Sequence, residues 1–189
     1  ELEDTVKSIL QLTPTSFWLQ AYKFINIKNT ELREQLKKYS WDQSQITDSD
    51  ILIVFAVPTN FDRKFIEKHT ENLQKIRWIT DEKKASVTNF ITASTIENWE
   101  SIWLNSFEDW LACQAYIALW NLMTWLAVLW IDACPIEWFS NEKYDELLNL
   151  KEKNLSSKVI LAIWKRWAED KYQNEKKVRF PKEELFIDL

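Results

Sequence analysis

The chain has 189 residues, of which 46% are hydrophobic, and its 24 basic and 29 acidic side chains give a formal net charge of -5. This length suits one domain with a sizeable core, and the apolar share excludes a disordered chain. The acidic balance argues against nucleic-acid binding, and the only two cysteines, Cys113 and Cys134, exclude a disulfide framework and favour a reducing, cytoplasmic compartment.

Helix and strand signals alternate at the start of the chain. Residues 2–11 carry apolar side chains at helical spacing and predict a helix. Residues 21–28 are rich in aromatic and branched side chains, which predicts a strand. Thr30 is placed to cap a second helix that runs to about Tyr39.

The middle of the chain begins with a nearly continuous apolar run at residues 50–57. Such a run is typical of a strand buried on both faces, and Pro58 ends it. Two charged amphipathic stretches, at about 60–76 and 82–97, predict helices. Ser106 followed by Asp109 is a helix-start pattern. The remaining expected features are a long apolar helix at about 107–130, a break at Pro135, a short helix near 141–149 and a strand at 158–163.

The long apolar helix has no charged residue over the 22 positions from Trp110 to Ile131, a length that can span a bilayer. Gln114, Asn121 and Thr124 lie at spacings of 7 and 3, so they share one helical face. Acidic residues bracket the segment on both sides, without a positive flank. We therefore expect a buried core helix facing a partner or a cofactor, and not a membrane span.

One feature of the composition is abnormal, because the chain has no glycine and 12 tryptophans. Average usage of about 7% predicts roughly 13 glycines in a chain of this length. Folded domains need residues that tolerate positive φ at helix ends and turns, and Asn and Asp fill only some of those places. The pattern favours the hypothesis that most tryptophans stand where a parent chain had glycine.

Four ordered stretches carry motifs. They are Thr-Pro-Thr-Ser-Phe-Trp-Leu-Gln at 13–20, Trp-Asp-Gln-Ser-Gln-Ile-Thr-Asp at 41–48, the long helix with its continuation to Pro-Ile-Glu-Trp-Phe at 109–139, and Lys-Val-Arg-Phe-Pro at 177–181. In this order they resemble the FMN-dependent NAD(P)H nitroreductase family, covering nearly the whole chain. Family glycines correspond to tryptophans of this chain at 18, 120, 130, 138 and 164, and Trp125 also falls where relatives often have glycine, whereas Trp41 and Trp110 fall where the family often has tryptophan.

The resemblance implies an α+β fold with a mostly antiparallel central sheet flanked by helices, in a homodimer. It implies one domain over residues 1–189 that lacks the family's N-terminal segment, whose R-x-S motif binds the flavin phosphate. The C-terminal apolar residues Leu185, Phe186 and Ile187 would extend to the partner subunit, as family tails do.

The activity implied is an FMN-dependent oxidoreductase, which takes a hydride from NAD(P)H and reduces nitroaromatics or quinones through the flavin. Neither nucleic acid nor a membrane is an expected partner. One alternative is a flavin-binding relative, such as a flavin destructase, without reductase turnover. The other is an inactive chain with tryptophan in place of glycine, since inserting ten indoles into a packed core would unfold a domain of ordinary stability.

The flavin phosphate and ribityl chain have two sets of candidate residues. In the family pattern, Lys177 and Arg179 pair with the phosphate dianion; without that pattern they would read as an exposed basic tail. The loop residues Pro14, Thr15, Ser16 and Trp18 would offer hydroxyl and N–H groups to the ribityl and phosphate oxygens, although the same letters also suit an ordinary turn.

The flavin ring has its candidates in the other motifs. Asp42 and Gln45 would face the pyrimidine edge, although the family usually has Asn in place of Asp42 and an ionised carboxylate donates nothing. Pro135, Ile136, Glu137 and Trp138 form the most informative stretch. In the family, backbone N–H groups here reach the flavin N5 and O4, which makes Glu137 and Trp138 the catalytic candidates. An indole at 138 should collide with the flavin or the flanking loop, and the Glu137 carboxylate is equally consistent with a surface group.

The polar residues of the long helix have two interpretations. Gln114 would bind the cofactor and Asn121 would lie near the dimer seam, or both would hydrogen-bond within the core. The other chemistries lack support, because His69 is the only histidine and Cys113 and Cys134 have no CxxC spacing. We therefore predict no metal site.

Overall fold

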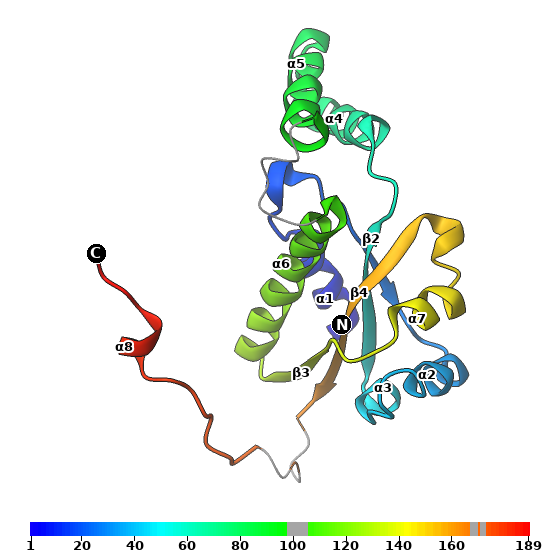
Figure 1. The fold of residues 1–189 in the computed structure, drawn as a ribbon, viewed down its shortest axis with the longest axis vertical. Helices are drawn as coiled ribbons and strands as arrows, with labels where there is room; N and C mark the ends of the chain where they lie inside the picture. The colour runs from blue at the N-terminus through cyan, green and yellow to red at the C-terminus, as the bar shows by residue number, and fades with distance from the viewer. Residues whose placement is uncertain (98–105, 167–169, 171–172) are drawn as a thin grey trace.

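The computed structural model describes residues 1–97, 106–166, 170 and 173–189. Its centre is a four-stranded sheet in the order β1-β2-β4-β3 (Figure 1). All three neighbouring pairs run antiparallel. The strands are β1 (Lys23–Asn26), β2 (Ile51–Pro58), β3 (Ile131–Ile136) and β4 (Leu155–Lys165). Together with the surrounding helices, this sheet confirms the expected α+β class.

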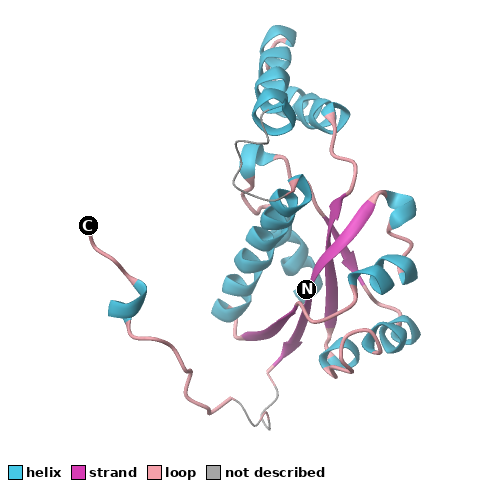
Figure 2. Ribbon diagram, viewed as in Figure 1, coloured by secondary structure: helices cyan, strands magenta, loops and turns pink. Residues whose placement is uncertain are grey.

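Helices cover both faces of the sheet (Figures 1 and 2). One face carries α1 (Leu2–Gln11) and α6 (Phe107–Val128), and the other carries α2 (Thr30–Lys37), α3 (Gln45–Asp48) and α7 (Asn141–Leu147). A hairpin of two helices projects from one end of the sheet, formed by α4 (Arg63–Arg77) and α5 (Asp81–Thr92). The short elements are a 3-10 turn at Ser16–Trp18, a π-helical turn at Ala93–Glu97, a 3-10 turn at Lys151–Lys153 and α8 (Lys182–Leu185).

The core has two layers because the central strands are buried on both faces. In β2, Ile53 and Phe55 pack on the side of α1 and α6, whereas Leu52 and Val54 pack on the side of α2 and α7. All eight residues of β2 are buried. The period of two along a strand thus divides one continuous apolar run between two hydrophobic clusters, as its composition predicts.

The helix α6 begins at the expected place, since the Ser106 side chain accepts a hydrogen bond from the N–H of Asp109. It is long and apolar enough to cross a membrane by length and composition. However, it packs its Leu111, Ala115 and Leu122 side against the sheet. One side of the helix therefore belongs to the core, as expected, while several apolar residues on its other side stay exposed, among them Ile117, Trp120, Trp125, Val128 and Leu129.

Two local predictions are corrected. The N-cap of α2 is Asn29, whose side chain accepts from the N–H of Leu32, and Thr30 is the first helical residue. Pro135 does not break the chain, because it lies within the strand β3. This strand is at the edge of the sheet, where a residue without an N–H costs no ladder bond on its open side.

The tryptophans mark unusual backbone. Trp18, Trp41, Trp78 and Trp130 all have left-handed φ, between 53° and 60°. Trp41 is therefore also at a backbone position that favours glycine, which the family resemblance alone does not indicate. These four side chains are 63–90% exposed, so they do not overpack the core, and the expectation that they would unfold the domain in that way is wrong for them. Trp99, Trp103 and Trp167 lie outside the described residues.

Candidate functional site

The loop from Thr13 to Trp18 is anchored on α6. The backbone N–H of Ser16 donates to Oε1 of Gln114 at 2.9 Å, and Nδ2 of Asn121 donates to Oγ1 of Thr13 at 3.0 Å. Gln114 is buried, so its amide is committed to holding this loop. The polar face of the long helix therefore serves hydrogen bonds within the chain, as one of the two interpretations predicts.

The same loop is held in a costly conformation. Phe17, Trp18 and Gln20 have φ of 55°, 56° and 48°, in the left-handed region that favours glycine. The hydroxyl of Thr15 accepts from the N–H of Gln20 at 3.1 Å, and the guanidinium of Arg77 lies 5.4 Å from the Trp18 ring centroid. Pro14 is exposed and Thr15 and Ser16 are half-buried, so the two hydroxyl side chains are partly open to solvent.

The end of β3 presents free backbone donors. Ile136 is buried and pairs with Ile160, which fixes the point where the strand ends. Beyond it, the N–H groups of Glu137 and Trp138 have no hydrogen-bond partner among the described residues. Both residues are exposed, so these donors can face a ligand.

The segment around Asp42 lies against this strand end. Nε2 of Gln43 donates to the carbonyl of Trp138 at 3.3 Å, and the Trp41 and Trp138 ring centroids are 5.2 Å apart. Trp41 and Asp42 both have left-handed φ. Asp42 is exposed, while Gln45 is half-buried on α3. The motifs at 41–48 and 135–138, far apart in sequence, are thus brought together.

Tyr116 joins the helix α6 to this surface. Its hydroxyl donates to Oε1 of Glu137 at 2.5 Å. Burial, followed by this bond to Glu137, raises the pKa of Tyr116 well above its usual value, so the phenol keeps its proton. Tyr116 also lines an open groove of about 530 Å³ along α6, together with Pro14 of the loop.

Sequence reasoning missed two residues of this surface, Gln43 and Tyr116. Each lies inside a motif, between residues that the motif singled out. Their position inside the motifs was the signal that could have found them. Tyr116, two residues after Gln114, lies on a different face of the helix from Gln114.

Lys177 and Arg179 are not brought to the loop within one chain. The segment that contains them is exposed and runs away from the sheet towards α8 (Figure 1). Nη1 of Arg179 donates to the carbonyl of its neighbour Val178 at 2.6 Å.

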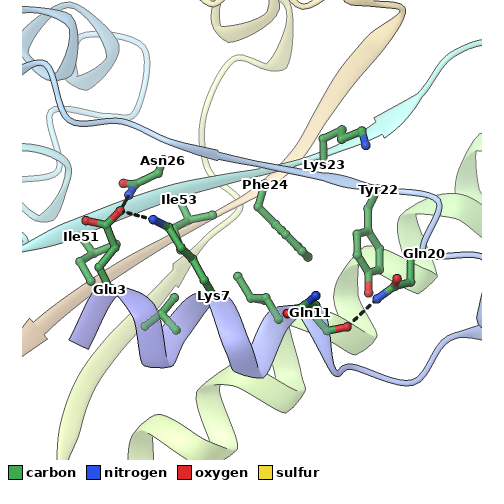
Figure 3. Close-up of a pocket in the computed structure, with 12 residues that line it drawn as sticks. Glu3, Lys7, Gln11, Gln20, Tyr22, Lys23, Phe24, Asn26, Ile51 and Ile53 are labelled. Carbon is green, nitrogen blue, oxygen red and sulfur yellow. Dashed lines mark hydrogen bonds and ion pairs between the residues drawn. The ribbon is translucent and has the colours of Figure 1, made fainter. Parts of the chain in front are cut away.

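A second hollow, of about 400 Å³, lies between α1 and the edge strand β1 (Figure 3). Glu3 lines it and accepts hydrogen bonds from Asn26 at 3.1 Å and from Lys28 at 2.8 Å. The bond from Lys28, followed by an ion pair with Lys7, lowers the pKa of Glu3 to about 2. None of the predicted site residues lines this hollow.

The arrangement suits a flat, electron-accepting group better than a metal ion. Among the described residues there is no group of three or more histidine, cysteine or acidic side chains that could hold a metal. The free N–H groups of Glu137 and Trp138 can stabilise negative charge on a ligand edge, and the hydroxyls of Thr15 and Ser16 suit a polyol chain. These donors fit FMN, while the exposed indoles of Trp41 and Trp138 crowd the same surface.

Comparison with known proteins gives consistent relatives. A model of the nitroreductase family matches residues 2–163. A protein of Staphylococcus epidermidis, whose name provisionally assigns it as an NAD(P)H nitroreductase, is 34% identical over 191 residues, covering 91% of this chain and 82% of that relative. The oxygen-insensitive NAD(P)H nitroreductase of Salmonella typhimurium is 28% identical over 195 residues, covering 100% of this chain and 89% of its own.

Solved structures agree on the fold. A nitroreductase-like protein of Streptococcus mutans has a TM-score of 0.79 at 19% identity, covering 99% of this chain and 87% of its own. A protein of Exiguobacterium sibiricum, solved in complex with FMN, has a TM-score of 0.79 at 17% identity, covering 99% of this chain and 85% of its own. The matched motifs, the fold and the family model together show that this chain belongs to the nitroreductase family.

Proposed function

We propose that the chain is an FMN-dependent NAD(P)H oxidoreductase that reduces nitroaromatics or quinones. The observation that carries the proposal is the pair of free N–H groups at Glu137 and Trp138, next to a loop fixed on α6 by Gln114. When bound, FMN would supply hydride chemistry, and the protein would supply position and electrostatics.

Each segment has a role in this proposal. Pro14, Thr15, Ser16 and the backbone at Trp18 would bind the ribityl chain and phosphate, and Gln45 would bind the pyrimidine edge. The N–H groups of Glu137 and Trp138 would stabilise negative charge as the flavin is reduced. Asp42 offers no donor when ionised, so we assign it no bond to the flavin.

We also propose a cytoplasmic homodimer. The exposed apolar side chains of α6, among them Ile117 and Trp120, form a surface that a second copy would bury. The C-terminal segment, with Leu185, Phe186 and Ile187 at 62–87% exposure, would pack on the partner and carry Lys177 and Arg179 to a phosphate.

The test is anaerobic spectroscopy of the purified protein loaded with FMN. The proposal expects a bound flavin spectrum that NADPH or NADH bleaches and that a nitroaromatic or a quinone restores. A bound flavin that neither nucleotide bleaches would favour a binding protein without turnover. A protein that takes up no flavin, even after Trp138→Gly, would refute the proposal.

A further inference from the structure

The strand end that carries the free donors is held at several points. Ile136 is fixed by its pairing with Ile160, and the carbonyl of Trp138 is held by Gln43. The Glu137 side chain accepts a hydrogen bond from the hydroxyl of Tyr116, 21 residues earlier on α6. This bond, at 2.5 Å, joins the long helix to the strand end across an exposed surface.

The bond matters because of what the Glu137 carboxylate would otherwise do. An ionised carboxylate only accepts hydrogen bonds, and the two free N–H groups closest to it in the chain are its own and that of Trp138. Side chains that bond to a nearby backbone compete for such donors. A carboxylate turned onto them would occupy the donors and place negative charge where an electron-rich ligand edge must approach.

Tyr116 is suited to prevent this. Its phenol keeps its proton, because burial and the bond to Glu137 both raise its pKa. It is also carried by α6, whose opposite side is packed in the core, so the hydroxyl is presented from a rigid element.

We propose that Tyr116 is a positioning residue of the flavin site, whose hydroxyl holds the Glu137 carboxylate away from the N–H groups of Glu137 and Trp138 and so keeps them open for the flavin. The inference rests on the proposed function and adds to it a residue that acts through Glu137. It predicts that the carboxylate, once released, is harmful to flavin binding.

The test measures FMN dissociation constants of the apoprotein by flavin fluorescence. Tyr116→Phe keeps the ring and removes the hydroxyl, and we expect FMN to bind about tenfold more weakly, the scale of one charged hydrogen bond. Tyr22→Phe is the matched control, since Tyr22 is buried and lines a different hollow, which contains none of the proposed flavin-site residues. It should leave FMN binding unchanged.

The second variant separates positioning from a merely structural role. In Tyr116→Phe/Glu137→Ala the released carboxylate is gone, so FMN affinity should return to that of the parent chain. An unchanged dissociation constant in Tyr116→Phe would overturn the inference, and so would a defect that persists in the double variant. The series is repeated with Trp138→Gly in every member, and loss of FMN binding throughout would refute the proposed function itself.

Discussion

At the scale of single residues, the backbone explains the abnormal composition. Trp78 is 90% exposed at the left-handed end of α4, and Trp130 is 77% exposed just beyond α6, with φ of 55° and 60°. A left-handed residue after a helix is the usual place of glycine, and a residue with a Cβ there costs about 1–2 kcal/mol. Asn149 and Asn154 fill similar places at lower cost.

We therefore expect Trp78→Gly and Trp130→Gly each to raise the free energy of unfolding by about 1 kcal/mol, because glycine removes the Cβ conflict and little packing is lost. Equilibrium unfolding in urea measures the change. Trp125→Gly is the matched control, since Trp125 is 52% exposed inside α6 without positive φ and should lose about 1 kcal/mol. Equal effects at all three positions would contradict this account.

At the scale of elements, apolar patterning was sufficient where burial is complete. The apolar run at 50–57 predicts a central strand, and the structure has β2 there with every residue buried; α6 follows from its Ser106 start and its length. The strand β3 was missed because it lies at an edge, where Pro135 and the half-buried Asp132 and Cys134 are tolerated.

The site shows the same division. Motif letters indicate which segments form it, but the contacts between segments depend on the fold. The bond from Tyr116 to Glu137 joins residues 21 positions apart, and the bond from Gln43 to Trp138 joins residues 95 positions apart. Neither bond follows from the spacing of residues in the sequence. The position of the basic tail residues, away from the loop in one chain, also depends on tertiary structure.

The burial of His69 in α4 makes the stability of the fold depend on pH. His69 is half-buried, its Nε2 has no hydrogen-bond partner among the described residues, and burial lowers its pKa below 6.5. As the pH falls, His69 is protonated in the unfolded chain before it is protonated in the folded chain. The stability that depends on neutral His69 is therefore complete above pH 6.5 and is lost as the pH falls through the folded pKa. Urea unfolding between pH 7 and 5 should show a smaller loss for His69→Gln than for the parent chain; an equal loss would contradict the assignment.

At the scale of the whole molecule, the exposed apolar side of α6 is the surface that most needs a partner. Sedimentation should give a dimer for the parent chain. We expect Ile117→Glu to yield a monomer, because a charge would be buried in the interface. Ile76→Glu is the control, since Ile76 is 66% exposed on α4, away from α6, and should leave the dimer intact. A monomeric parent chain would contradict the proposed assembly.

The central claim is that this surface is a flavin cradle, shaped by backbone donors and crowded by an indole where a side-chain-free residue belongs. The most direct measurement is the FMN dissociation constant of the parent chain beside those of Trp138→Gly and Trp138→Ala. We expect Trp138→Gly to bind FMN most tightly, with a dissociation constant at least about tenfold lower than that of the parent chain, or ~1.4 kcal/mol. The dissociation constant of Trp138→Ala should lie between the two. Equal or weaker binding of FMN by Trp138→Gly would contradict it.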